Sequence, residues 1–159
     1  MKRCAFFPGC LIPAMYPGME FSIRETLPKV GIEVADLESA SCCPDPIYFK
    51  SRDKLKWLSV AARNLTLAEE MELDIFTNCS GCTATLSEAY HLLAEDAELK
   101  ATVNRRLGRI GKEYKGTSGI RHIVTLLRDI AGYDVVQKSV TRPLEGLKVA
   151  IHYGCHLLK

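Results

Sequence analysis

The chain lacks any long hydrophobic run. No stretch of its 159 residues approaches the roughly 18 apolar residues of a membrane-spanning helix. The apolar part of the N-terminus, Met-Lys-Arg-Cys-Ala-Phe-Phe-Pro-Gly-Cys, is too short for the hydrophobic region of a secretory signal. We therefore expect a cytoplasmic protein without direct membrane insertion, whose thiols are reduced or bound to metal.

The chain also lacks an excess of charge of either sign. Its formal net charge of +2 offers no electrostatic attraction for nucleic acid, and no nucleic-acid partner is expected. Basic residues recur in residues 100–115, but acidic residues are interspersed among and before them, as is typical of a solvated face. No Gly-rich phosphate loop, Ser/His/Asp order or carboxylate pair stands out. Nucleotide-binding and common hydrolytic sites are therefore not indicated.

What is present is the composition of an ordinary globular domain, with 47% hydrophobic and 25% charged residues. Short apolar runs alternate with amphipathic segments, which predicts strands and helices in turn. Strands are expected at residues 3–7, 32–37, 73–77 and 147–153, and helices at residues 20–30, 53–72, 83–93, 95–114 and 120–131. This alternation predicts an α/β fold, a Rossmann-like parallel sheet of about four strands flanked by helices.

Seven cysteines are present, and five of them have an informative spacing. Cys10 is followed after 31 residues by the adjacent pair Cys42–Cys43, and after a further 35 by Cys79-Ser-Gly-Cys82. Each group comes just after an expected strand. Because the carboxyl ends of parallel strands line one edge of a sheet, we expect all five thiols to gather at this carboxyl edge.

Five thiols exceed the four ligands of a tetrahedral zinc and the four thiolates of an ordinary iron–sulfur cluster. Two adjacent side chains chelate one metal only through a strained ring, so the vicinal pair more naturally serves two irons or lets one thiolate bridge. Cys79 and Cys82 open a helix, whose amides and dipole favour thiolate. An iron–sulfur centre with more thiolates than usual is our interpretation.

Three alternatives stay open for these cysteines. A structural zinc would use four of the five. A thioredoxin-like dithiol would use only Cys79 and Cys82 and leave the others idle. In the third alternative, all five are plain core cysteines that bind no metal. Cys4, inside the first expected strand, is a separate residue that we do expect to be a core cysteine.

The end of the chain resembles its beginning. Phe6-Phe-Pro-Gly-Cys10 and His152-Tyr-Gly-Cys155 both combine a strand, an aromatic residue, glycine and cysteine. We therefore divide the chain into a first domain, residues 1–145, and the opening strand of a second, incomplete domain, residues 146–159.

Two residues of this last segment are candidates for function. Cys155 would ligate a second metal centre if the repeat is real. His156, beside it, is a candidate proton donor, and no other catalytic residue is assigned. His91 and His122 fall within expected helices and are interpreted as surface or core-edge residues.

The cysteine spacing is that of the cysteine-rich or CCG motif, and the chain resembles the N-terminal half of the B subunits of the heterodisulfide reductase family. The resemblance covers essentially the whole chain and includes these segments: Phe7-Pro8-Gly9-Cys10, Ala40-Ser41-Cys42-Cys43-Pro44, Ala61-Ala62-Arg63-Asn64, Glu88-Ala89-Tyr90-His91-Leu92-Leu93 and His152-Tyr153-Gly154-Cys155-His156. The broader motif also occurs in iron–sulfur subunits of lactate, glycolate and glycerol-3-phosphate oxidising systems and of a type of succinate dehydrogenase.

The resemblance implies two CCG domains in the full-length protein, each with a noncubane 4Fe–4S cluster. Carried over by position, the ligands of the first cluster are Cys10, Cys42, Cys43, Cys79 and Cys82, and Cys155 opens the second motif. The implied activity is that of an oxidoreductase which reduces a disulfide, that of coenzyme M and coenzyme B or a related one, between the two clusters. The implied partners are a ferredoxin-like subunit and a flavin-bearing subunit of the same complex.

Residues 1–159 alone are expected to be inactive, since half of that machinery is missing from them. Two other functions stay open. One is an electron-transfer iron–sulfur subunit of a lactate, glycolate, glycerol-3-phosphate or succinate oxidising complex. The other is a zinc-stabilised binding module without a redox role.

Overall fold

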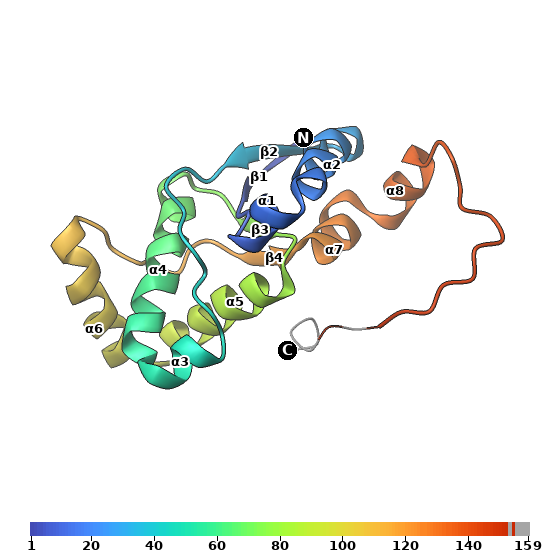
Figure 1. The fold of residues 1–159 in the computed structure, drawn as a ribbon. Coiled ribbons are helices and arrows are strands. Elements are labelled where there is room, and N and C mark those ends of the chain that lie inside the picture. The colour runs from blue at the N-terminus through green and yellow to red at the C-terminus, as the bar shows by residue number, and fades with distance from the viewer. Residues whose placement is uncertain (153, 155–159) are drawn as a thin grey trace.

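A computed structural model describes residues 1–152 and residue 154. Its centre is a four-stranded sheet in the order β2-β1-β3-β4, in which every neighbouring pair is parallel. The strands, which Figure 1 shows side by side, are β1 (Lys2–Phe6), β2 (Ile32–Asp36), β3 (Ile75–Thr77) and β4 (Ile120–His122). The predicted α/β class with a parallel sheet is confirmed.

The central strand β1 supplies both faces of the core. Successive side chains of a strand point to opposite faces, and all four residues from Cys4 to Phe7 are almost fully buried. Cys4 and Phe6 pack on one face, where the Phe6 ring stacks on Phe76 of β3 at 5.0 Å between centroids. Ala5 and Phe7 pack on the other. The sheet is therefore buried on both sides, as a parallel sheet requires.

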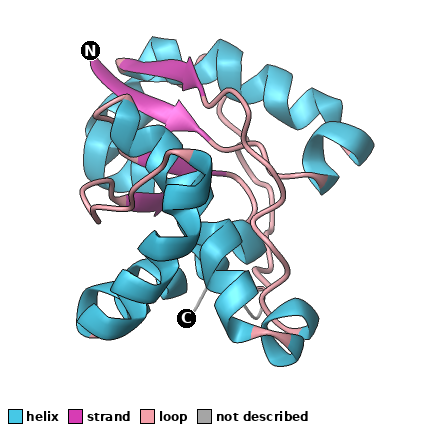
Figure 2. Ribbon diagram, turned by 90° about the vertical axis from the view of Figure 1, so that its left-hand side faces the viewer, coloured by secondary structure: helices cyan, strands magenta, loops and turns pink. Residues whose placement is uncertain are grey.

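Helices cover each face, and Figure 2 shows them on both sides of the strands. The larger core lies under α4 (Lys54–Glu70), α5 (Ser80–Glu95) and α6 (Ala97–Leu107), with Trp57 and Leu86 fully buried. The smaller core, on the opposite face, lies under α2 (Pro17–Thr26), the 3-10 turn η1 (Leu27–Val30), α7 (Ile123–Leu126) and the π turn η3 (Leu127–Ala131).

Four shorter elements complete the described chain: α1 (Leu11–Met15), α3 (Tyr48–Arg52), the 3-10 turn η2 (Gly108–Ile110) and α8 (Tyr133–Ser139). Beyond α8, the described residues from 140 onward form neither helix nor strand and are exposed. Among the helices of the described residues, none is both long enough and apolar enough to cross a membrane.

Two expected elements were wrong. The fourth strand is Ile120–His122, inside the expected helix 120–131, which begins only at Ile123. Its backbone is fixed by the sheet, since the N–H of Ile75 donates to the Gly119 carbonyl at 2.8 Å. No strand forms at residues 147–152, where the sequence predicted one. A short apolar run does not reveal how long its strand is or which strands will pair with it. Periodicity alone therefore does not separate a three-residue strand from the helix that follows it.

The expected helix 95–114 is also shorter than predicted. It ends at Leu107, turns through η2 and stops at Gly111, which adopts the left-handed φ of +70°. A glycine in this conformation is a common helix terminator. The division at residue 145 into two domains stays a prediction.

Candidate metal centre

The five cysteines of the predicted set line one cavity at the carboxyl edge of the sheet. Cys10 directly precedes α1, Cys42 and Cys43 lie in the loop that leaves β2, and Cys79 and Cys82 lie at the start of α5, just after β3. The cavity has a volume of about 190 Å³ and is otherwise lined by glycine, proline, aliphatic side chains and one aspartate. Parallel strands, not sequence proximity, bring the three groups together.

The sulfurs differ in depth. Cys43 and Cys82 form the floor, with residues 7% and 4% exposed, whereas Cys10 and Cys42 belong to exposed residues at the rim. The Cys10 and Cys42 sulfurs lie 3.9 Å apart. A group held here would therefore be embedded in the protein on one side and accessible on the other.

Gly9 makes room for the deepest sulfur. Its φ of +73° lies in the left-handed region, and a Cβ at this position would stand 3.0 Å from the Cys82 sulfur. Any L side chain here would be strained by its backbone and would press on Cys82 as well. The turn that follows β1 is thus shaped around a cysteine 73 positions further along the chain, counted from Gly9 to Cys82.

The thiols at the start of α5 share protons unequally. A hydrogen bond from the Cys82 thiol is the main cause that lowers the pKa of Cys79 to about 5, with support from the Cys82 and Gly81 N–H groups, and burial acts against it. The Cys82 thiol likewise lowers the pKa of Cys43. The contacts with Cys43 and with Cys79, together with burial, raise the pKa of Cys82 itself. Of these three thiols, Cys79 therefore carries negative charge most readily.

Cys42 behaves in the opposite way. Although Cys42 is an exposed residue, partial desolvation of its sulfur, followed by the neighbouring sulfur of Cys43 and then that of Cys10, raises the pKa of Cys42 to about 12. Without a positive partner, the cavity holds only part of its thiols as thiolates. A cationic group bound among them would favour deprotonation of the rest.

The donor set of the cavity is rich in sulfur. Five thiols surround the cavity. Within residues 1–152 and 154, no three His, Cys, Asp or Glu side chains converge closely enough to hold one metal ion. Soft thiolate donors around a mainly apolar cavity are the environment of iron–sulfur clusters.

Sequence reasoning missed one neighbour of this centre, His122. It was assigned to a helix, but it ends β4 and caps α7, where its Nδ1 accepts from the Val124 N–H at 3.3 Å. Burial lowers the pKa of His122, against a hydrogen bond with the Asn78 backbone and the charge of Cys79. Only the position of β4 next to β3 places His122 near Cys79, so no sequence signal could have indicated it.

The remaining candidates lie elsewhere. Cys4 is 1% exposed inside β1, away from the cavity, as expected of a core residue. His91 is exposed on α5. Cys155 and His156 lie outside the described residues. The preceding Gly154 is described, and a Cβ on it would lie 3.8 Å from the Ser80 hydroxyl between Cys79 and Gly81.

Fold and site together define a class of protein, the α/β domains that gather cysteines at the carboxyl edge of a parallel sheet. The profile of the CCG family, described as "Cysteine-rich domain", matches residues 4–87. The chain therefore belongs to the CCG cysteine-rich domain family.

Several known proteins are similar to the chain. The B subunit of the ferredoxin:CoB-CoM heterodisulfide reductase of Methanosarcina mazei is 46% identical over 159 residues, which is 100% of this chain and 53% of the relative. The "8-methylmenaquinol:fumarate reductase membrane anchor subunit" of Wolinella succinogenes is 35% identical over 99% of this chain and 54% of the relative. The chain thus spans about half the length of the curated relatives it matches.

A solved structure supports the fold. "Crystal structure of a hypothetical protein from Helicobacter pylori" matches with a TM-score of 0.71 over 80% of this chain and 25% of that chain, at 20% sequence identity. At this identity the likeness concerns the fold alone.

Proposed function

We propose that the chain is the N-terminal half of a heterodisulfide-reductase-type iron–sulfur subunit. Its ligands to a noncubane 4Fe–4S cluster are Cys10, Cys42, Cys43, Cys79 and Cys82. The observation that carries this proposal is the single cavity lined by all five thiols, which arrive from the ends of three neighbouring strands. The similarity to the B subunit from Methanosarcina mazei supports it.

The chain's own residues prepare the site for such a cluster. The N–H groups of Gly81 and Cys82 stabilise the Cys79 thiolate, and apolar side chains of the rim, such as Leu11 and Ile12, limit the access of water. A bound cluster supplies one-electron transfer, and its potential depends on hydrogen bonds to sulfur and on exposure. The exposed rim at Cys10 and Cys42 is the side from which a substrate would approach.

In the complete protein we propose that this rim faces a second CCG domain, opened by Cys155, and that a small-molecule disulfide is reduced between them. The substrate is the coenzyme M–coenzyme B disulfide or a related one. Reduction consumes two electrons and two protons and gives two thiols. A ferredoxin-like subunit and a flavin-bearing subunit of the same complex would deliver the electrons, and this chain alone would not turn over.

The first test is anaerobic analysis of iron, zinc and acid-labile sulfide in the chain, with EPR spectra after oxidation and reduction. We expect about four irons and four sulfides per chain. One zinc without sulfide would contradict the proposal and favour a zinc-stabilised module.

Cysteine variants test the ligand set. Cys42→Ser and Cys43→Ser should each abolish the native EPR signal, because each removes a thiolate from the cavity. Cys4→Ser is the matched control and should leave the signal nearly intact, since Cys4 lies in the core away from the cavity. Equal loss of signal in Cys4→Ser would show that the effect reflects folding and not ligation.

A second candidate function is an electron-transfer subunit without a substrate of its own. The similarity to the Wolinella succinogenes fumarate reductase subunit favours it. Thiol titration separates the two in the full-length protein. A disulfide reductase releases two thiols per disulfide supplied with reductant, whereas an electron-transfer subunit passes electrons to its complex and releases none.

A further inference from the structure

We propose that Arg63, Asn64 and Thr85 form a clamp that holds the loop of the vicinal cysteines in its ligating shape, with Asn64 as the principal positioning residue. The inference rests on the proposed function, because it concerns how two of the proposed ligands are presented. It also gives a role to the Ala-Ala-Arg-Asn segment of α4, residues 61–64, which does not line the cavity.

The loop has no regular structure to support it. Residues 37–47, which connect β2 to α3, form neither helix nor strand. Their backbone N–H and C=O groups therefore have no ladder of partners, although buried backbone groups are nearly always paired. Pro44, directly after the two cysteines, has no N–H to contribute. Within the loop, the Ala40 N–H donates to the Leu37 carbonyl at 3.3 Å and the Ile47 N–H donates to Asp45 Oδ1 at 3.0 Å. The backbone groups nearest the two cysteines find partners in side chains of α4 and α5.

Asn64 supplies most of them. It is fully buried on α4, and its Oδ1 accepts from the Ser41 N–H at 3.0 Å and from the Ser41 hydroxyl at 3.2 Å. Its Nδ2 donates to the Cys42 carbonyl at 3.1 Å. One amide thus fixes the peptide groups on both sides of residues 41 and 42, and with them the direction in which the first thiol of the pair leaves the chain.

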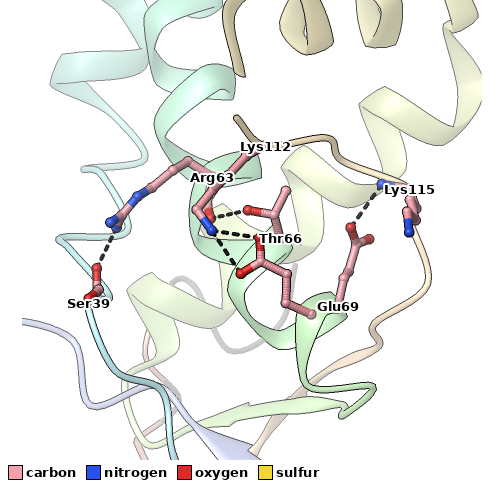
Figure 3. Close-up of polar contacts among 7 residues, drawn as sticks. Ser39, Arg63, Thr66, Glu69, Lys112 and Lys115 are labelled. Carbon is pink, nitrogen blue, oxygen red and sulfur yellow. Dashed lines mark hydrogen bonds and ion pairs between the residues drawn. The ribbon is translucent and has the colours of Figure 1, made fainter. Parts of the chain in front are cut away.

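Two further side chains hold the loop at its ends. Arg63 Nη1 donates to the Ser39 carbonyl at 2.6 Å, a contact that Figure 3 shows reaching from α4 to the loop. Ser39 has a φ of +62°, which is unusual for a residue with a side chain. On the other side, the fully buried Thr85 of α5 donates its hydroxyl to the Pro44 carbonyl at 3.0 Å.

The three side chains of the clamp therefore hydrogen-bond to the loop backbone at several separate positions. They hold the carbonyl groups of residues 39, 42 and 44 and the amide of residue 41. Residues 42 and 43 carry the thiols between these points. Because α4 and α5 are anchored in the larger core, the pair is positioned by the rigid body of the domain and not by the cluster.

The chain contains a matched control for Asn64. Asn104 of α6 makes the same kind of two-pronged contact with another loop, where its Oδ1 accepts from the Tyr114 N–H at 2.9 Å and its Nδ2 donates to the Tyr114 carbonyl at 3.0 Å. That loop leads into the amino end of β4, at the opposite edge of the sheet from the cysteines. Asn104→Ala and Asn64→Ala therefore remove similar contacts, only one of which concerns the cavity.

The experiment compares the two variants by three measurements. Thermal unfolding reports the loss of stability. Iron content and the EPR signal report the cluster. The alkylation rate of Cys43 by iodoacetamide in the metal-free, reduced chain, followed by peptide mass spectrometry, reports the loop without any cluster. We expect Asn64→Ala to lose the native EPR signal and to expose Cys43, with alkylation about tenfold faster.

Asn104→Ala should lose less stability, because Asn104 is half-buried and makes two hydrogen bonds to its loop where Asn64 makes three. It should keep both the signal and the slow alkylation. If Asn64→Ala equals Asn104→Ala in EPR signal and in Cys43 alkylation, the clamp is only structural and the proposal is overturned.

Should Asn64→Ala not fold, Arg63→Met decides in its place, since it removes the donor to the Ser39 carbonyl and leaves the surroundings of the Cys43 sulfur unchanged. Faster Cys43 alkylation in Arg63→Met supports the clamp, and an unchanged rate opposes it. A wild-type chain that binds no iron would overturn the proposed function, while the alkylation rates would still decide for or against the clamp.

Discussion

Cys79 and Cys42 lie on the same cavity, yet their thiols are expected to differ in charge near neutral pH. The pKa of Cys79 is lowered to about 5, chiefly by the Cys82 thiol, and that of Cys42 is raised to about 12, chiefly by burial. Iodoacetamide reacts with thiolate and not with thiol. In the metal-free chain, Cys79 should therefore be alkylated before Cys42 at every pH from about 6 to 8.

The sign of the pH dependence follows from the lowered pKa. Alkylation of Cys79 should stay nearly constant as the pH falls from about 8 to about 6 and should decline only as the pH passes through about 5. Peptide mass spectrometry after timed quenching measures both sites at once. A rate at Cys79 that still rises steeply from about pH 7 to about pH 9 would mean that its thiol is unperturbed.

Gly9 offers a second test at the scale of one residue. Gly9→Ala places a Cβ 3.0 Å from the Cys82 sulfur and strains a φ of +73°. Gly31→Ala is the control, because Gly31 has a similar φ of +81° but open space around it. We expect both variants to lose about 1 kcal/mol of stability from the backbone, and only Gly9→Ala to lose iron. Equal iron content in the two would remove the assigned role of Gly9.

At the scale of elements, the Glu69 carboxylate is one of the side chains that hold the loop before β4. Glu69, near the end of α4, accepts hydrogen bonds from the backbone N–H groups of Lys115, Gly116 and Thr117. Figure 3 shows the contact with Lys115. Glu69→Gln puts an NH₂ group where a second acceptor oxygen was. We expect a loss of about 1–3 kcal/mol in urea denaturation.

The adjacent residue provides the control. Glu70 forms an exposed ion pair with Lys112 at 2.6 Å, and Glu70→Gln should cost less than about 1 kcal/mol. If the two variants lose equal stability, the three backbone contacts of Glu69 do not hold the loop.

The elements also show what the sequence could and could not predict. Cys10, Cys42 and Cys79 were placed at one edge because each follows an apolar run, and alternation of strands and helices fixes where such runs end. β4 was missed because three residues carry no periodicity, and with it the position of His122. Asn64 was part of a recognised segment, but its partners in the loop are 22 and 23 residues away, and no local pattern encodes them.

At the scale of the whole molecule, we predict that residues 146–159 can be removed without unfolding the domain. The described residues 140–152 are all exposed and form neither helix nor strand. A chain ending at residue 145 should therefore keep its thermal midpoint within about 2 °C, since the described residues 146–152 that it lacks are exposed. Circular dichroism melts of the two lengths measure this, with iron content as the second readout. A midpoint lower by several degrees would place residues 146–159 in the first domain.

The parallel pairing of β1 with β3 determines when the metal can be acquired. Cys10 and Cys79 become neighbours only after strands about 70 residues apart in the chain have paired, and such non-local contacts form late in folding. In the unfolded chain, by contrast, Cys42 is already beside Cys43 and Cys79 is already close to Cys82. Such pairs of thiols bind metal before the cavity with all five thiols has formed. Reconstitution should therefore succeed when iron and sulfide are added after refolding, and fail when they are present before it.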